Sequence, residues 1–310
     1  MSIVSDVIAE VLALIADRGA HGAVVPIARL NDLRRDLDDL RDGDFHTWWI
    51  DRRAAVADRF VPDTLDFQPQ SIVVAVLPCN KVSVRFDDAG TTVECLVPPT
   101  YTDLDAPEAE LLSALNESLK SHGYSAAIAG NGLPAKLLAV HCGLALYGRN
   151  NIAFNEVFGS YMGVLAFYTD MPCGDTEWNP LGRLPICEKC HACVAACPTG
   201  AIDRDRRIID ADRCVTALNE LPGEFPDWMT PSMHSCLVGC MKCQDCCPVN
   251  APFRKKVTQG ASFDADATAE LLAHREGEVF SESLTAALTD AGLIDGSDTL
   301  PRNLKALIRR

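Results

Sequence analysis

The sequence predicts an α+β fold in three parts, and three observations lead to this expectation. Helix-like and strand-like hydrophobic patterns alternate over residues 1–172, which predicts an α/β domain. Cysteines then crowd into residues 173–256, where the hydrophobic periodicity fades. Short amphipathic patterns return over residues 257–310 and indicate a helical tail. A chain of 310 residues has room for one large domain and a smaller one.

The overall charge argues against one class of function. The chain carries 43 acidic and 28 basic residues, a formal net charge of -15, whereas duplex-binding proteins need a basic face to displace counterions. The first residues lack the basic start of a secretory signal and a twin-arginine pair, and the apolar runs are too short to span a bilayer. We therefore expect a cytoplasmic protein that makes no membrane contact.

The first domain begins with two helices and two strands. Residues 3–15 carry apolar side chains at helical spacing with acidic residues opposite, and residues 30–41 form a charged helical pattern. A short valine-rich strand is expected over residues 23–26. Residues 71–77, stopped by Pro78, are apolar on both faces, which is typical of a buried central strand.

A hairpin is expected next in the chain. Residues 82–86 and 91–97 are rich in strand-forming side chains and flank the turn sequence of residues 87–90. Adding this hairpin to the strand at residues 71–77 predicts a mixed sheet for the first domain.

Further helices and one more strand complete the expected elements. A helix over residues 107–122 has a proline at its start and acidic residues in its first turn, and a second helix is expected over residues 134–144. A strand over residues 161–168 ends the domain, and residues 171–185 form the expected linker. The tail should hold two or three short helices, the last being a basic amphipathic helix at residues 300–310 that packs back on the body.

The cysteine-rich part opens with the run found in bacterial ferredoxins, in which spacings of two, two and three residues precede a proline: Cys187, Cys190, Cys193, Cys197 and Pro198. In this run three thiolates wrap one [4Fe-4S] cluster and the fourth reaches a second cluster. A zinc site uses two pairs of ligands and would leave cysteines over. A disulfide framework does not suit bunched cysteines without an export signal. We predict a ferredoxin-like domain with two [4Fe-4S] clusters.

The remaining ligands for the second cluster come from later in the chain. Cys214 stands alone, and a second run ends in a Cys-Pro pair like the first. The crossed arrangement of two-cluster ferredoxins assigns one cluster to Cys187, Cys190, Cys193 and Cys247. It assigns the other cluster to Cys197, Cys214, Cys240 and Cys243.

Six further cysteines leave alternatives open. Cys246 also completes an even run with the two cysteines before it, so spacing alone does not choose between Cys246 and Cys247. We prefer Cys247 because a proline follows it, and Cys236 competes for the same places. Four cysteines stand singly and are expected to be small buried hydrophobes: Cys79, Cys95, Cys142 and Cys173. Cys142 follows a histidine and is also a candidate nucleophile.

With these motifs in view, the chain resembles the epoxyqueuosine reductase family, which shares a core with reductive dehalogenases. The resemblance rests on the cluster run, on residues 213–220 and on residues 239–248, and it extends upstream to residues 133–152. It implies a nitroreductase-like α/β domain that holds cobalamin and receives electrons from the ferredoxin-like domain. The electrons would come from a low-potential donor such as ferredoxin or flavodoxin.

The resemblance also suggests residues for the site that the clusters serve. His141, Arg149, Asn150 and Asn151 lie in the matching segment and are expected to contact the cofactor, although the last three are equally suited to capping a turn. Tyr101 is a candidate proton donor or, alternatively, a tyrosine that anchors a loop.

Three departures from the family pattern affect the expected substrate. Residues 145–151 replace the family's Gly-Trp-x-Gly-Lys pattern, Ala129 or Asn131 stands where the family has an acidic proton donor, and the C-terminal helical repeats are shortened. We therefore expect an iron-sulfur reductase acting on a small organic molecule or nucleoside, with tRNA possible but not favoured. The alternative is an electron-transfer or corrinoid-activating partner protein without a substrate of its own.

Overall fold

The computed structural model describes most of the chain, namely residues 3–43, 45, 47–55, 60–101, 104–130, 132–275 and 277–309. By their internal contacts the residues group into two compact units, each made of two stretches of chain. The first unit comprises Met1–Pro78 and Leu104–Glu188, and the second comprises Cys79–Asp103 and Lys189–Arg310. The three-part division expected from the sequence stays a prediction.

A four-stranded sheet with the order β1-β2-β8-β5 forms the centre of the first unit. Its strands are β1 (His21–Pro26), β2 (Ser71–Pro78), β5 (Ala126–Ile128) and β8 (Met162–Thr169). Strand β2 pairs along its whole length with β8 and also pairs with β1, so it is the central strand that its apolar run predicted. All three strand pairs are antiparallel, so the expectation of a mixed sheet here is wrong.

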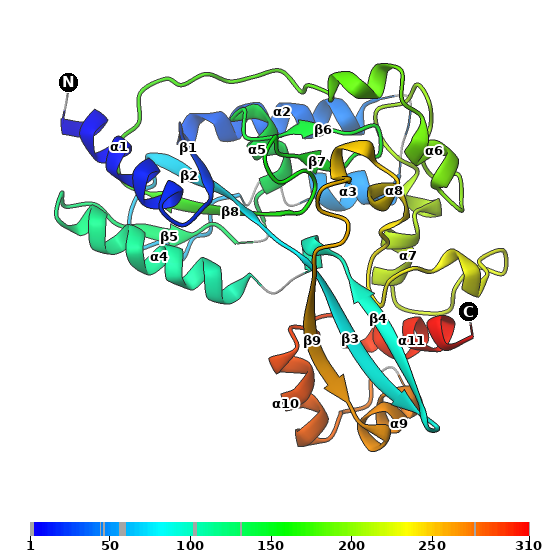
Figure 1. Ribbon diagram of the computed structural model, residues 1–310. Helices are drawn as coiled ribbons and strands as arrows, with labels where there is room; N and C mark the ends of the chain where they lie inside the picture. The colour runs from blue at the N-terminus through cyan, green and yellow to red at the C-terminus, as the bar shows by residue number, and fades with distance from the viewer. Residues whose placement is uncertain are drawn as a thin grey trace. The chain divides into compact units, whose positions relative to one another are not determined.

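Helices cover both faces of this sheet (Figure 1). They are α1 (Ile3–Ala16) and α4 (Asp105–Lys120) on one face, and α2 (Leu30–Arg41), α3 (Trp48–Ala54) and α5 (Ala135–His141) on the other side of the unit. Alternate residues of a strand point to opposite faces. Ile72, Val74 and Val76 accordingly pack with α2 and α5, whereas Val73 and Ala75 pack with α1 and α4.

The mixed sheet lies in the second unit, where three strands have the order β4-β3-β9. Strands β3 (Lys81–Asp88) and β4 (Thr91–Val97) form the predicted hairpin. Strand β9 (Val257–Phe263), which the sequence did not predict, pairs with β3 in parallel. The hairpin therefore belongs to a different sheet from the one expected, and that sheet holds the parallel pair.

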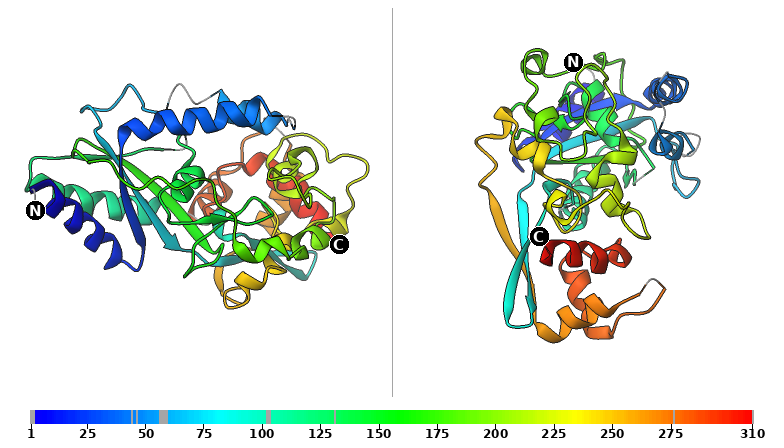
Figure 2. Two further views of the ribbon diagram at one scale, coloured as in Figure 1. Left: turned by 90° about the horizontal axis from the view of Figure 1, so that it is seen from above. Right: turned by 90° about the vertical axis from the view of Figure 1, so that its right-hand side faces the viewer.

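Three short helices cover one face of this second sheet (Figure 2, right). They are α9 (Ala265–Ala273), α10 (Glu282–Asp290) and α11 (Leu300–Ile308), as the tail's amphipathic patterns predicted. In the shared core the rings of Phe86 and Phe263 stack with centroids 4.9 Å apart. Leu284 from α10 and Leu304 from α11 are fully buried in the same core.

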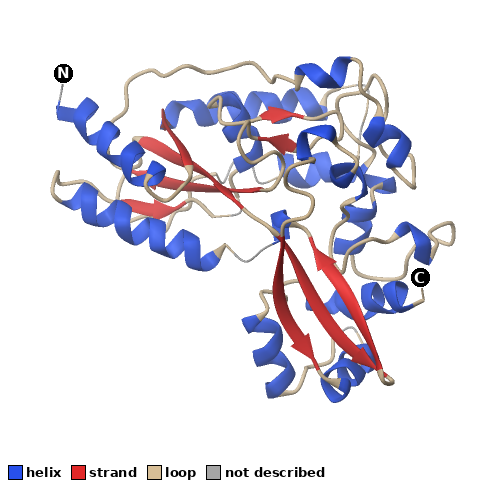
Figure 3. Ribbon diagram, viewed as in Figure 1, coloured by secondary structure: helices blue, strands red, loops and turns tan. Residues whose placement is uncertain are grey.

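The cysteine-rich segment has short helices joined by long loops (Figure 3). The helices are α6 (Ala192–Ala196), α7 (Val215–Glu220) and α8 (Lys242–Asp245). The segment also holds the 3-10 turns η4 (Pro185–Glu188), η5 (Ala211–Arg213), η6 (Pro231–Met233) and η7 (Pro248–Asn250). Other parts of the chain hold η1 (Ile27–Arg29), η3 (Pro99–Tyr101) and η8 (Ser297–Thr299).

A small hairpin completes the first unit. Strands β6 (Leu146–Tyr147) and β7 (Ala153–Phe154) pair in antiparallel fashion, and Tyr147 also bridges to Arg183. Through this bridge the hairpin supports the chain that leads into the cysteine run. Among the helices of the described ranges, none is long and apolar enough to cross a membrane.

Candidate metal centre

All fourteen cysteines lie in the described part of the chain and are free thiols. The eight predicted cluster ligands all fall between residues 187 and 247, on the loops and short helices of the cysteine-rich segment. Cys187 is buried, and the other seven are partly exposed. The chain therefore has enough free thiols for two clusters with four ligands each.

Two short helices of the second unit present cysteines in the same way. Helix α6 contains Cys193, helix α8 contains Cys243, and the two helices lie against each other. After each helix the chain becomes extended at a cysteine that precedes a proline, with φ -70° and ψ 114° at Cys197 and φ -68° and ψ 126° at Cys247. Cys197 and Cys247 thus occupy equivalent positions in a structural repeat.

Three of the four predicted ligands of the second cluster lie close together. Burial raises the pKa of the Cys214 thiol, the backbone amides of Ala217 and Thr216 act in the opposite direction, and the Cys240 and Cys197 thiols add to the rise. Such mutual effects require these sulfurs to be near one another. Cys214 directly precedes α7. The sequence indicated Cys214 as a ligand only because the second cluster needs four cysteines.

The competing cysteines have other partners. The Cys246 thiol donates a hydrogen bond to the carbonyl oxygen of Cys243 at 3.4 Å, which requires a protonated sulfur. Cys236 is fully buried, and its sulfur lies 3.6 Å from the hydroxyl of Ser235. Burial raises the pKa of the Cys246 thiol, and the nearby Cys247 and Cys190 thiols raise it further, so Cys246 lies close to two proposed ligands. The choice of Cys247 as the ligand stays a prediction from the Cys-Pro pair.

Over the described ranges, no group of three or more His, Cys, Asp or Glu side chains is placed to hold one metal ion. A zinc site would need its sulfurs about 2.3 Å from one centre. A [4Fe-4S] cluster differs because each thiolate binds a different iron, so its ligands surround a larger volume.

Tyr101 lies at the end of η3, against the cysteine-rich segment. Its hydroxyl donates a hydrogen bond to Oε1 of Glu220. Burial raises the pKa of Tyr101 well above its ordinary value, and the nearby Glu220 carboxylate raises it further. A Cβ added at Gly239 would lie 2.6 Å from Cε2 of the ring, so only glycine fits beneath Tyr101. These contacts favour the loop-anchoring alternative.

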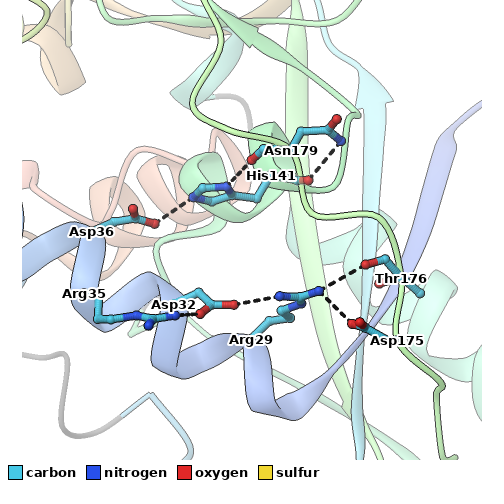
Figure 4. Close-up of polar contacts among 8 residues, drawn as sticks. All are labelled: Arg29, Asp32, Arg35, Asp36, His141, Asp175, Thr176 and Asn179. Atoms are coloured by element: carbon cyan, nitrogen blue, oxygen red, sulfur yellow. Dashed lines mark hydrogen bonds and ion pairs between the residues drawn. The ribbon is translucent and has the colours of Figure 1, made fainter.

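His141 is held in the first unit by both ring nitrogens (Figure 4). Nδ1 lies 2.6 Å from the carbonyl oxygen of Asn179, and Nε2 lies 2.7 Å from Oδ2 of Asp36. The ring also stacks on Trp178, with centroids 4.4 Å apart. Because both nitrogens already have protein partners, these hydrogen bonds give no support to the predicted cofactor contact of His141.

The other predicted cofactor residues form the turn between β6 and β7. Arg149 is only 5% exposed, and its guanidinium donates a hydrogen bond to the carbonyl oxygen of Cys187. Asn150 is buried, and its Oδ1 accepts a backbone N–H of the same turn at 3.3 Å. Asn151 has φ 58°, a left-handed conformation that asparagine tolerates. This geometry favours the turn-capping alternative and connects the turn to the first cysteine.

The remaining candidates are Cys142, the possible nucleophile, and the two positions considered for the acidic proton donor. Burial raises the pKa of the Cys142 thiol to about 12, so the thiol stays protonated near neutral pH and is a poor nucleophile. Ala129 is buried in the core on the α2 and α5 side of the sheet. Asn131, the other residue considered for the proton-donor position, lies outside the described residues.

The sequence did not point to a charged hollow at the start of α2. A cavity of about 490 Å³ is lined by Arg29, Asp32, Arg35 and Asp175, among others. Arg29 donates hydrogen bonds to Asp32 at 3.0 Å and to Asp175 at 2.7 Å (Figure 4). Its guanidinium also lies 5.2 Å from the centre of the Trp178 ring. The charged side chains that line this cavity form ion pairs with one another. They belong to no motif recognised in the sequence.

The cysteine-rich segment matches a known family model. Residues 186–250 match the 4Fe-4S double cluster binding domain. This range contains all eight cysteines assigned to clusters. The predicted combination of an α+β fold with a double-cluster domain is therefore confirmed, whereas the nitroreductase-like and ferredoxin-like details stay predictions.

Curated proteins of two kinds are similar to this chain. The epoxyqueuosine reductase of Pseudomonas aeruginosa is 29% identical over 189 residues, which are 59% of this chain and 51% of that protein. The epoxyqueuosine reductase of Escherichia coli is 35% identical over 114 residues, 36% of this chain and 29% of that protein. The tetrachloroethene reductive dehalogenase of Dehalobacter restrictus is 28% identical over 167 residues, 52% of this chain and 29% of that protein. The chain thus spans about half or less of these relatives.

Solved structures show the same likeness in three dimensions. The epoxyqueuosine reductase of Bacillus subtilis gives a TM-score of 0.63 at 20% identity, covering 98% of this chain and 82% of that one. An epoxyqueuosine reductase bound to an epoxyqueuosine-modified tRNA stem loop gives 0.62 at 19% identity, with coverages of 98% and 81%. The fold is therefore shared, and the predicted resemblance to epoxyqueuosine reductases is confirmed.

Proposed function

We propose that this chain is an iron-sulfur oxidoreductase that passes single electrons through two [4Fe-4S] clusters. The observation that carries the proposal is the match of residues 186–250 to a double cluster binding domain. The repeat of α6 and α8, each followed by a Cys-Pro pair, supports two clusters held in equivalent ways. Once bound, each cluster would transfer one low-potential electron at a time.

The proposed ligands are those of the crossed arrangement. One cluster takes Cys187, Cys190, Cys193 and Cys247, and the other takes Cys197, Cys214, Cys240 and Cys243. The surroundings fit thiolate ligands, because the Ser235 hydroxyl donates to Sγ of Cys240 at 3.4 Å and Oγ1 of Thr199 lies 3.5 Å from Sγ of Cys197. Such hydrogen bonds to sulfur are one means by which a protein sets a cluster's potential.

We further propose that the reaction is the two-electron reduction of an epoxide. Removal of the epoxide oxygen as water consumes two electrons and two protons, and two one-electron clusters deliver that number of electrons. The relatives named epoxyqueuosine reductase support this reaction class. A low-potential protein such as ferredoxin or flavodoxin is the proposed electron donor.

The proposed substrate is an epoxyqueuosine nucleoside carried by tRNA. The net charge of the chain disfavours tRNA, but a structurally similar epoxyqueuosine reductase is bound to a modified tRNA stem loop. This likeness reverses the preference. An acidic chain can still grip a short stem loop through a local basic segment, and residues 254–256 provide one with the sequence Arg-Lys-Lys.

Cobalamin is not given a role in this proposal. The residues predicted to hold it do not fit that task, because both ring nitrogens of His141 are hydrogen-bonded and Arg149 and Asn150 bury their polar groups within the protein. Tyr101 is likewise not assigned as the proton donor, since its hydroxyl donates to Glu220 and burial makes it a weaker acid.

One observation favours a second candidate function. The internal hydrogen bonds of these predicted site residues suit a protein that only carries electrons to a partner. The reductase and the electron carrier differ in whether they convert a substrate. An electron carrier would be reduced and reoxidised by a partner but would leave a modified tRNA stem loop unchanged.

Anaerobically reconstituted protein would test the proposal. With dithionite as the reductant, an epoxyqueuosine-containing tRNA stem loop should lose one oxygen atom per nucleoside, measured by mass spectrometry of the digested RNA. The Cys214→Ser variant should lose this activity, whereas Cys142→Ser, a matched change outside the clusters, should retain it. An unchanged nucleoside with fully loaded, reducible clusters would refute the reductase and favour the electron carrier.

A further inference from the structure

The C-terminal helix α11 does more than complete a hydrophobic core. Leu300 and Leu304 are fully buried among the side chains of the second unit. The neighbouring Asn303 is also fully buried, although an amide is costly to bury without hydrogen bonds. Arg302 is half-buried beside it. The two side chains bond to each other, and their other hydrogen bonds lead to the cysteine-rich segment.

Arg302 caps the end of helix α7. Its guanidinium donates to the carbonyl oxygen of Leu218 at 2.9 Å, to that of Asn219 at 3.4 Å, and to that of Gly223. It also lies 3.9 Å from the centre of the Phe225 ring. The last carbonyls of a helix lack partners within the helix and carry partial negative charge, so a cation here stabilises the helix end.

Asn303 extends this contact to the next cysteine loop. Its Nδ2 donates to the carbonyl oxygen of Asn219 at 3.1 Å. Asn219 is itself fully buried, and its own Nδ2 donates to the carbonyl oxygen of Gly239 at 2.9 Å. Gly239 directly precedes Cys240 and has φ 63°, a left-handed conformation suited to glycine.

Helix α7 connects these contacts to a second cysteine. Cys214 directly precedes the helix, whose six residues rise only about 9 Å. Its far end is fixed by Arg302 and Asn303, and its Asn219 side chain is bonded to the loop of Cys240. Buried hydrogen bonds that begin at Asn303 in α11 therefore link the helix after Cys214 to the loop before Cys240.

We propose that Arg302 and Asn303 are positioning residues for the second cluster, the one assigned to Cys197, Cys214, Cys240 and Cys243. This inference rests on the proposed two-cluster function. A cubane binds only when its four thiolates stand at fixed separations, so loosening α7 should release this cluster and leave the first one in place. The tail helix is then part of the cluster site.

The test compares iron content in variants of the full chain after anaerobic reconstitution. Asn303→Leu keeps a similar volume but removes the amide, and Arg302→Met removes the cation while keeping the stem. Each should fall from about eight irons per chain to about four. The exposed residue Lys305 on the same helix provides the control, because Lys305→Ala should keep about eight.

Electron paramagnetic resonance identifies the cluster that is lost. The spectrum of reduced Asn303→Leu should match that of Cys214→Ser, which lacks the second cluster, and differ from that of Cys190→Ser, which lacks the first. Arg302→Lys keeps a donor and a charge and should retain both clusters. Circular dichroism establishes that each variant is folded, and if Asn303→Leu does not fold, Arg302→Met supplies the same comparison.

The possible failures are distinguishable. Folded variants with about eight irons and wild-type spectra would overturn the positioning role while leaving the two-cluster function intact. Equal loss of both clusters would also overturn it, because that result indicates general destabilisation. Wild-type protein that binds only about four irons would instead refute the proposed function itself.

Discussion

The imidazole of His141 stacks on the indole of Trp178, with ring centroids 4.4 Å apart and planes 7° apart. On the same indole the guanidinium of Arg29 lies 5.2 Å from the ring centre. His141 and Asn179 are further joined through the backbone, since the N–H of Asn179 donates to the carbonyl oxygen of His141 at 2.8 Å. These contacts fasten the loop after β8 onto helices α2 and α5.

This arrangement predicts that His141 acts in stability. In His141→Leu the contact with the Asp36 carboxylate and the bond to the Asn179 carbonyl are both lost, so the free energy of unfolding should fall by about 1–3 kcal/mol. Urea denaturation followed by circular dichroism measures the change. Trp178→Phe keeps a stacking partner and should cost less. Full loss of a bound cofactor with unaltered stability would contradict the structural role.

Cys246 and Cys247 should behave oppositely. Cys246→Ser should leave both clusters in place, because the Cys246 thiol bonds to a carbonyl oxygen and is not a proposed ligand. Cys247→Ser should remove one cluster, about four irons per chain, because Cys247 repeats the backbone conformation of Cys197. Iron analysis and absorption near the sulfur-to-iron charge-transfer bands give the readout. The reverse result would move the ligand to Cys246.

Arg149 should support the first cysteine of the run. Arg149→Met removes the buried guanidinium that donates to the Cys187 carbonyl and should destabilise the protein by about 1–3 kcal/mol. Because Cys187 is then held less firmly, the first cluster should dissociate faster on addition of a chelator. Arg149→Lys, which retains a donor, is the matched control. Equal rates of iron release from Arg149→Met and wild type would exclude this role.

The buried Cys142 thiol gives a prediction about pH. Burial raises its pKa to about 12, so at pH 8 only about one thiol in ten thousand is ionised, against roughly a quarter for a free cysteine. Its reactivity should stay low as the pH rises through 9 and increase only towards 12. Alkylation by iodoacetamide followed by peptide mass spectrometry tests this. Rapid labelling of Cys142 at pH 8 in the folded protein would revive it as a nucleophile.

Much of the fold follows from local patterns in the sequence. The apolar run of β2, the turn between β3 and β4 and the amphipathic stripes of α1, α4 and the tail each specify an element by their own periodicity. Strand β9 was not predicted because only three of its seven residues are apolar and it contains Gly260. That glycine is required by tertiary packing, since an added Cβ would lie 2.5 Å from Cγ1 of Val82.

Part of the candidate site could likewise be predicted from the sequence, and part could not. Cysteine spacing indicates the ligands because the cluster imposes a fixed geometry on a short loop. Asn219, Arg302 and Asn303 carry no such mark, because their role depends on contacts between segments far apart in the chain. His141 and Arg149 were chosen by resemblance alone, and their hydrogen bonds within the protein could not be read from sequence position.

The iron content of wild-type protein tests the central claim most directly. After anaerobic reconstitution and removal of unbound iron, elemental analysis should give about eight irons and eight acid-labile sulfides per chain. Reduction by dithionite should then bleach the visible absorption of both clusters. About four irons per chain, or stoichiometric zinc without iron, would contradict the account of two [4Fe-4S] clusters held by eight cysteines.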